Sequence, residues 1–139
     1  MNDVAGILDT FELLGDWEQR YHYLVELGDA LPAMAERDRV EENRVKPCMS
    51  QVWVRLAPDP ARPGRLAASG DCDSAIIKGV VGLLVSLCDG KTPEEVLALD
   101  FDGLFEGLKL GEHLSPSRHV GIYAIVEKLR EQAAACVDL

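Results

Sequence analysis

Four cysteines, at positions 48, 72, 88 and 136, are the candidate nucleophiles of this 139-residue chain. They form no CxxC pair and show no regular spacing, so the pattern favours neither a disulfide framework nor a closed zinc site. A thiol attacks as its thiolate, whose formation is favoured by nearby cations and disfavoured by burial or nearby carboxylates. The surroundings of each cysteine therefore indicate which one could react.

Three of the cysteines lie in surroundings that disfavour reaction. Cys88 ends the apolar run "VVGLLVSLC", which predicts a buried thiol with a raised pKa. Cys72 stands between Asp71 and Asp73, and two negative neighbours disfavour a third negative charge. Cys136 lies near the C-terminus, where we expect an exposed thiol with no fold to position a substrate around it.

Cys48 differs because Arg44 and Lys46 closely precede it and because it lies on a connection rather than inside a helix or strand. A positive neighbourhood lowers a thiol pKa. Pro47 restricts its own backbone, so the connection can present the sulfur with little conformational freedom to lose. The sequence therefore favours Cys48 as the functional thiol.

Sulfur transfer is the chemistry that such a thiol best supports. The three histidines are distant from Cys48 and form no motif with it, so a hydrolase has no evident general base. Dithiol redox chemistry would need a resolving cysteine, usually at CxxC spacing. Attack of a thiolate on the outer sulfur of a donor persulfide needs only access and thiolate character.

The composition narrows the possible partners and compartment. A formal net charge of −10 disfavours nucleic-acid and anionic-membrane partners, which attract clustered Lys and Arg. No apolar run is long enough for a spanning helix, and the N-terminal residues lack the pattern of a signal peptide. We therefore expect a single cytoplasmic domain over residues 1–139, with no membrane and no nucleic-acid partner.

The periodicity of apolar residues predicts an α+β fold in which a small antiparallel β-sheet of about three strands is flanked by helices. Alternation after Cys48 predicts a strand, and "PDPARPG" predicts a turn to a returning strand. Capping signals at Asp16, Thr92 and Ser115 predict helix starts. The predicted elements are helices over residues 4–14, 16–31, 74–87, 92–96, 102–108 and 115–135, and strands over 52–56 and 65–69.

Four segments resemble the SufE family of sulfur acceptors, and the likeness covers nearly the whole chain. In order they are "DWEQRYHYLVELGDALP", "NRVKPCMSQVW", "GDCDSAIIKG" and "HLSPSRHVG". The second resembles the family segment around the acceptor cysteine, with Pro47 where glycine is usual. The resemblance implies a SufE/NifU-like fold, and the related CsdE proteins share the same pattern.

The same resemblance implies a function. A cytoplasmic SufE-like protein binds a PLP-dependent cysteine desulfurase (SufS-like), receives sulfane sulfur on the residue matching Cys48 and stimulates the desulfurase. It then delivers sulfur to an Fe–S scaffold complex for iron–sulfur cluster assembly. The PLP belongs to the partner, so the chain would need no cofactor and would be a sulfur-transfer partner and activator rather than a stand-alone catalyst.

Five further residues are candidates for supporting Cys48 or binding the partner: Arg118, Arg44, Lys46, Asp71 and Asp73. Arg118 falls in the first turn of the last predicted helix, where a cation opposes the helix dipole. By similarity, its segment lies near the acceptor connection and could stabilise a persulfide anion or grip the partner. Asp71 and Asp73 could equally cap the buried helix, which is the simpler interpretation.

Two other functions remain open on the sequence. Cys48, Asp71, Cys72 and His113 offer thiolate, carboxylate and imidazole groups, as a metal-binding or Fe–S scaffold-like module would, although their spacing is not diagnostic. A pure activator that reshapes the desulfurase without ever carrying sulfur is the other alternative.

Overall fold

The computed structural model describes residues 4–45, 51–108 and 116–137, with the backbone alone described for 4–5 and 116–120. It has the expected α+β composition. In chain order the elements are α1 (Val4–Leu13), α2 (Trp17–Asp29), the 3₁₀ turns η1 (Glu36–Asp38) and η2 (Glu41–Asn43), β1 (Val52–Pro58), β2 (Leu66–Cys72), α3 (Ala75–Cys88), α4 (Pro93–Leu97), α5 (Phe101–Leu108) and α6 (Pro116–Ala135).

β1 and β2 pair as an antiparallel hairpin, in a register that runs from Val52 opposite Cys72 to Pro58 opposite Leu66. The expectation of about three strands is not met in the described chain, where the sheet has two. An isolated bridge between Arg44 and Trp53 occupies the place of a third strand. The pairing between Arg44 and β1 does not continue toward the N-terminus. The residues just before Arg44 form the 3₁₀ turn η2 and are therefore not extended.

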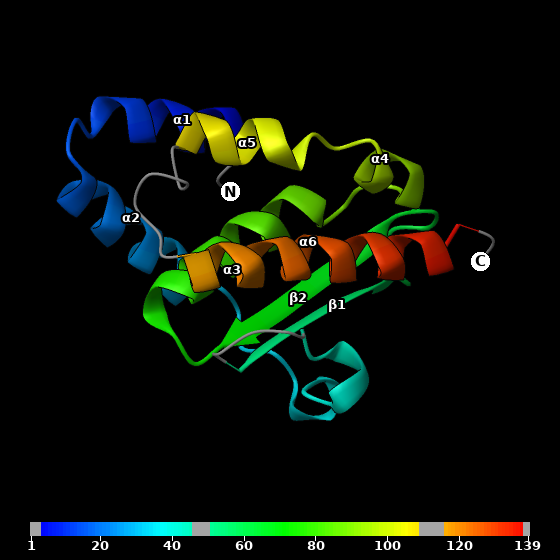
Figure 1. Ribbon diagram of the computed structural model, residues 1–139. Coiled ribbons are helices and arrows are strands. Elements are labelled where there is room, and N and C mark those ends of the chain that lie inside the picture. The colour runs from blue at the N-terminus through cyan, green and yellow to red at the C-terminus, as the bar shows by residue number, and fades with distance from the viewer. Residues whose placement is uncertain (1–3, 46–50, 109–115, 138–139) are drawn as a thin grey trace.

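Helix α3 is the centre of the core. Eleven of its fourteen residues are buried, as expected for a helix that is apolar on nearly every side. Figure 1 shows α3 and α6 above the sheet, with α1 and α5 forming a further layer over them. The inward side chains of β1 alternate along the strand, and Val52, Val54 and Leu56 are buried beneath the helices.

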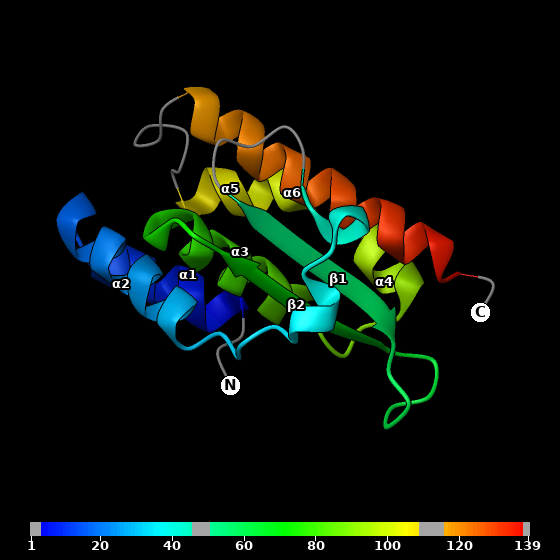
Figure 2. The same ribbon diagram turned by 90° about the horizontal axis from the view of Figure 1, so that it is seen from below.

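The outer face of the sheet is partly covered by the described residues that follow α2, residues 30–45. Figure 2 looks onto this face and shows the 3₁₀ turns lying over the strands. Two ion pairs join the first of these turns and the residue after it to the sheet, Arg39 to Asp71 of β2 at 2.7 Å and Asp38 to Arg55 of β1 at 3.5 Å. This covering leaves Trp53 half-buried on the outer face.

The predicted helix starts are confirmed where their residues are described. The Asp16 carboxylate accepts the Gln19 N–H at 2.9 Å, and Thr92 and Glu95 form a reciprocal capping box at the start of α4. In the described part of the chain, no helix is both long enough and apolar enough to cross a bilayer.

Candidate functional site

The predicted acceptor, Cys48, and the neighbouring Lys46 lie outside the described residues, but both ends of their segment are described. On one side, the Val45 N–H donates to the Val52 carbonyl at 2.8 Å. On the other, Gln51 and Asp73 exchange two hydrogen bonds, described below. Both ends of the segment are therefore held at the N-terminal end of β1, where β2 passes into α3.

Asp73 holds the C-terminal end of this segment. Its carboxylate accepts the Gln51 N–H at 3.0 Å, and its own N–H donates to the Gln51 carbonyl at 3.1 Å. The interpretation of Asp73 as a cap of the buried helix is wrong, because Ser74 is the N-cap residue of α3 and makes no side-chain capping bond. The backbone of Asp73 still continues the pairing of the two strands, so its carboxylate reaches the chain before β1 instead of the first turn of the helix.

Asp71 also does not cap α3. Its carboxylate lies 2.7 Å from the Arg39 guanidinium and 3.8 Å from the Lys78 ammonium, and it accepts the Cys72 N–H at 2.8 Å. It therefore links the chain after η1, strand β2 and helix α3. Asp71 does not cap the helix because it lies on the outer face of β2, and this position directs its carboxylate toward the chain that covers the sheet. Whether either aspartate contacts a partner remains a prediction.

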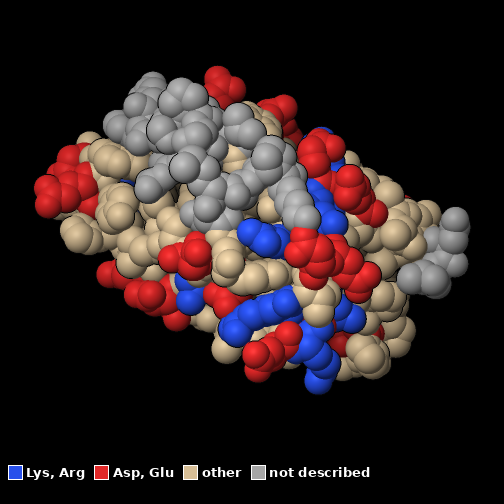
Figure 3. Space-filling view, turned by 60° about the horizontal axis from the view of Figure 1, so that its bottom comes forward, with Lys and Arg blue, Asp and Glu red and all other residues tan. Residues whose placement is uncertain are grey.

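The predicted cations are only partly described. The Arg44 guanidinium lies 3.9 Å from the Glu41 carboxylate, with about a third of its side chain exposed, so solvent screens the pair. The backbone of Arg118 lies in the first turn of α6, while its side chain lies outside the described residues. Figure 3 shows that basic and acidic side chains are interleaved on the face of the molecule that it views.

The three described cysteines are all buried. Cys88 is fully inaccessible, and burial raises the pKa of its thiol to about 12, with Lys91 lowering it and Asp89 adding to the rise. Cys72 is 7% exposed, and its Sγ accepts the Ser74 N–H at 3.4 Å.

The expectation that Cys136 is exposed is wrong, because its side chain is 8% exposed. The reason is helical periodicity. Ile122, Ile125, Leu129 and Ala133 form the buried face of α6, and Cys136 falls on the same face one turn after Ala133.

Two amide side chains near the site had no role in the sequence-based prediction. The side chain of Gln132 in α6 forms hydrogen bonds to the free edge of β1. Asn43 of η2 is the one polar residue that is buried in the described part of the chain. The available signal was a glutamine on the apolar face of α6, between Leu129 and Ala133. Such a residue needs a polar partner when it is packed.

The metal-binding alternative gains no support from the described residues. Among them, no three His, Cys, Asp or Glu side chains come together as a possible metal site. Cys48 and His113, two of the four ligands that this alternative needs, lie outside the described part of the chain, as does Ser115, the predicted cap of the last helix.

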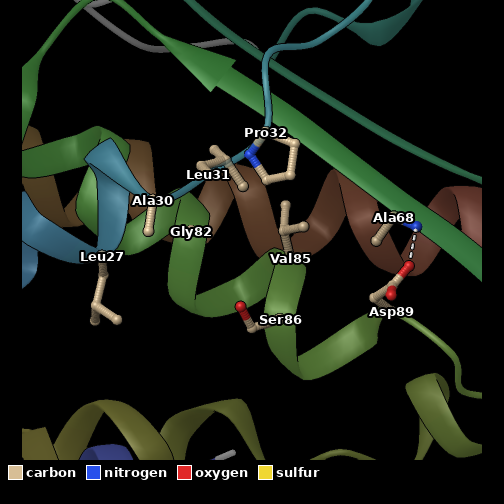
Figure 4. Close-up of a pocket in the computed structure, with 9 residues that line it drawn as sticks. All are labelled: Leu27, Ala30, Leu31, Pro32, Ala68, Gly82, Val85, Ser86 and Asp89. Carbon is tan, nitrogen blue, oxygen red and sulfur yellow. Dashed lines mark hydrogen bonds between the residues drawn. The ribbon is translucent and has the colours of Figure 1, made fainter. Parts of the chain in front are cut away.

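A separate hollow of about 500 Å³ lies between the C-terminal end of α2, helix α3 and β2. Figure 4 shows that its lining is mainly apolar, with Asp89 bonded to the backbone of Ala68. The same carboxylate is paired with Arg62 at 3.1 Å. With Asp89 already engaged, the lining offers no acid–base pair and no cysteine. Its residues are Leu27, Ala30, Leu31, Pro32, Ala68, Gly82, Val85, Ser86 and Asp89.

Comparison with known proteins finds relatives of this chain by sequence and by structure. Residues 5–133 match the family model of SufE, described as an Fe-S metabolism associated domain. An uncharacterised SufE-like protein of Rhizobium etli is 41% identical over 135 residues, covering 96% of this chain and 90% of that protein. The solution structure of a hypothetical protein from Thermus thermophilus superposes with a TM-score of 0.80 at 25% identity, over 98% of this chain and 96% of that one.

Proposed function

Because the chain belongs to the SufE family of Fe-S metabolism associated domains, we propose that it is a sulfur acceptor and carrier. It takes sulfane sulfur onto Cys48 from a PLP-dependent cysteine desulfurase, stimulates that enzyme and delivers the sulfur to an Fe–S scaffold complex. The chain acts in the cytoplasm, and it needs no cofactor because the PLP is on the partner.

The observation that carries this proposal is the burial of the other three thiols. Cys88, Cys72 and Cys136 are each less than a tenth exposed, so a donor persulfide from another protein cannot reach them without unfolding. Cys48 follows Arg44 and Lys46 between two described ends, Val45, which bonds Val52 of β1, and Gln51, which bonds Asp73. The choice of Cys48 therefore rests on elimination and on the family resemblance together.

The transfer step balances without an oxidant or a reductant. The Cys48 thiolate attacks the terminal sulfur of the donor's S–SH group, a new S–S bond forms at Cys48, and the donor's S–S bond breaks. The donor leaves as a thiolate, and Cys48 now carries the S–SH group. The sulfane sulfur keeps its oxidation level and simply changes carrier.

Cations near Cys48 assist this step by stabilising its thiolate and then the persulfide anion. In this proposal Arg44, Lys46 and Arg118 supply that charge or bind the desulfurase. Asp71 and Asp73 act through the backbone around the acceptor segment, since their carboxylates are already engaged by protein groups.

The test is incubation of the protein with a PLP-dependent cysteine desulfurase and cysteine, followed by intact-mass measurement without reductant. We expect an added mass of about 32 Da, one sulfur atom, on the peptide that contains Cys48. Cys48→Ser should abolish the addition, because no other thiol is accessible. Cys72→Ala is the matched control, since Cys72 lies opposite Val52 in the adjoining strand, and it should retain the addition.

Two outcomes would contradict the proposal. Sulfur found on Cys72 or Cys136 would place the acceptor elsewhere. Full stimulation of the desulfurase by the Cys48→Ser variant would show that the chain is an activator that never carries sulfur.

A further inference from the structure

The outer edge of β1 is closed by a side chain rather than by a third strand. The Gln132 Oε1 accepts the Leu56 N–H at 2.7 Å, and its Nε2 donates to the Val54 carbonyl at 2.9 Å. A carboxamide presents an acceptor oxygen and a donor N–H side by side, as a backbone peptide group does, and its NH₂ keeps a second N–H for another partner. Gln132 thus occupies a position on the strand edge that a neighbouring strand would otherwise fill.

The next carbonyl along the same edge of β1 is bound by Val45, three residues before Cys48. The Val45 N–H donates to the Val52 carbonyl at 2.8 Å, two residues before the carbonyl that Gln132 binds. Val45 and the Gln132 amide are therefore consecutive partners of one strand edge. Val45 itself is buried, with 1% of its surface exposed.

A second amide joins these two partners. The Gln132 Nε2 also donates to the Asn43 Oδ1 at 3.4 Å, and the Asn43 Nδ2 donates to the Asp38 carbonyl at 2.9 Å. Asn43 is 9% exposed, and a buried amide that lost its partners would carry a desolvation penalty. The Gln132–Asn43 pair therefore binds α6, β1 and η2 together immediately before the acceptor segment.

We propose that Gln132 and Asn43 are positioning residues for Cys48, which hold residues 43–45 against β1 and α6 and so fix the point from which the chain runs on to the acceptor thiol. This inference rests on the proposed function, because both concern Cys48. Helix α6 carries Arg118 in its first turn and Gln132 about 21 Å further along its axis. One helix therefore carries the backbone of Arg118 and, through Gln132, also holds residues 43–45, which precede Cys48.

The chemistry of the amide makes a sharp test possible. In Gln132→Glu, the ionised carboxylate can still accept the Leu56 N–H but has no hydrogen for the Val54 carbonyl or for Asn43. A protonated carboxyl would restore one donor. Because partial burial and two facing acceptors raise the pKa of such a carboxyl, the hydrogen bonds of residue 132 to Val54 and Asn43 should be lost as pH rises through that pKa and regained below it.

The experiment measures the rate at which Cys48 reacts with 2,2′-dipyridyl disulfide, which modifies thiols at neutral and at acidic pH. At about pH 7.5, we expect Gln132→Glu and Asn43→Ala to react about five to ten times faster than the wild type, as loss of one or two hydrogen bonds would predict. At about pH 4, near the ordinary pKa of Glu, the Gln132→Glu rate should approach that of the wild type while Asn43→Ala stays fast.

Two control variants separate positioning from general loss of stability. Ile125→Val removes a methylene from the fully buried face of α6 and should lower Tm without changing the rate at Cys48. Glu131→Gln alters the charge at the adjacent exposed position of the same helix and should leave the rate unchanged.

Wild-type rates at Cys48 in both amide variants would overturn the inference, as would an equal acceleration in Ile125→Val. The measurement uses no desulfurase. A wild-type protein that accepted no sulfur would therefore refute the proposed function, while the labelling rates would still decide the role of Gln132 and Asn43.

Discussion

At the scale of single residues, the cysteines show how the position in the fold controls the chemistry of a side chain. Cys88 lies at the end of the most buried helix, and removal from water raises the pKa of its thiol to about 12. Its thiolate is therefore scarce at neutral pH, and a donor sulfur has no path to it. Burial thus keeps the thiols of Cys72, Cys88 and Cys136 away from reagents in solution.

The raised pKa of Cys88 predicts how stability changes in alkali. In the unfolded chain this thiol titrates near its ordinary value of 9.0, while in the folded chain it stays protonated to about 12. This difference in pKa stabilises the folded protein. The stabilisation is fully present below about pH 9, and as pH rises from there toward 12 the free energy of unfolding falls by up to about 1.4 kcal/mol per pH unit.

Urea unfolding of the wild type and of Cys88→Ala between about pH 8 and pH 10.5 measures this contribution, since tyrosines and lysines titrate equally in both proteins. We expect the free energy of unfolding to fall more steeply with pH in the wild type. Parallel curves would show that the Cys88 thiol ionises in the folded protein as easily as in the unfolded one.

At the scale of elements, the contact between α2 and α3 depends on glycine. A Cβ at Gly79 would lie 2.1 Å from the Leu24 carbonyl oxygen, and one at Gly28 would lie 2.9 Å from the Gly79 nitrogen. Both obstacles are backbone atoms, which cannot move aside as a flexible side chain can. The backbones of the two helices are therefore in direct contact, and they can come this close because Gly28 and Gly79 have no side chain.

Gly79→Ala should consequently destabilise the protein even though alanine favours helix formation. We expect a loss of at least about 2 kcal/mol from the free energy of unfolding, at the upper end of the usual cost of overpacking. Gly15→Ala is the control, because a Cβ at Gly15 meets no atom within 4 Å. Chemical denaturation measures both, and an equal effect of the two changes would contradict the packing argument.

At the scale of the whole molecule, the layers differ in how deeply they are buried. Helix α3 lies between α2, the sheet and the other helices, whereas α1 forms part of the outer layer with α5 (Figure 1). Helix α1 contributes Ile7 and Phe11 to the core, while Leu13 at its end is 85% exposed. We therefore expect the outer layer to open without exposing the contact between α3 and the sheet.

Native-state hydrogen exchange tests this order of stability. We expect the amides of Val80–Leu84 in α3 to exchange only by global unfolding, because every residue from Val80 to Leu84 is buried. The amides of α1 should exchange faster, through local opening of the outer layer. Equal protection of α1 and α3 would show that the molecule unfolds as one unit.

The sequence by itself determined the local features of this protein. The capping signals at Asp16 and Thr92 and the apolar run ending at Cys88 act within a few residues, so the sequence predicted them correctly. The family was also recognisable from four ordered segments, because the residues that bear its signature are contiguous in each segment.

Only the tertiary structure decided the features that join distant segments. Gln132 meets Val54 and Leu56 across more than 70 residues, and no local pattern specifies that contact. The same holds for Asp73, which resembled a helix cap in sequence but bonds Gln51 beside the adjoining strand. Short-range preferences are set by neighbouring residues, whereas the partner of a polar side chain depends on which elements the folded core brings together.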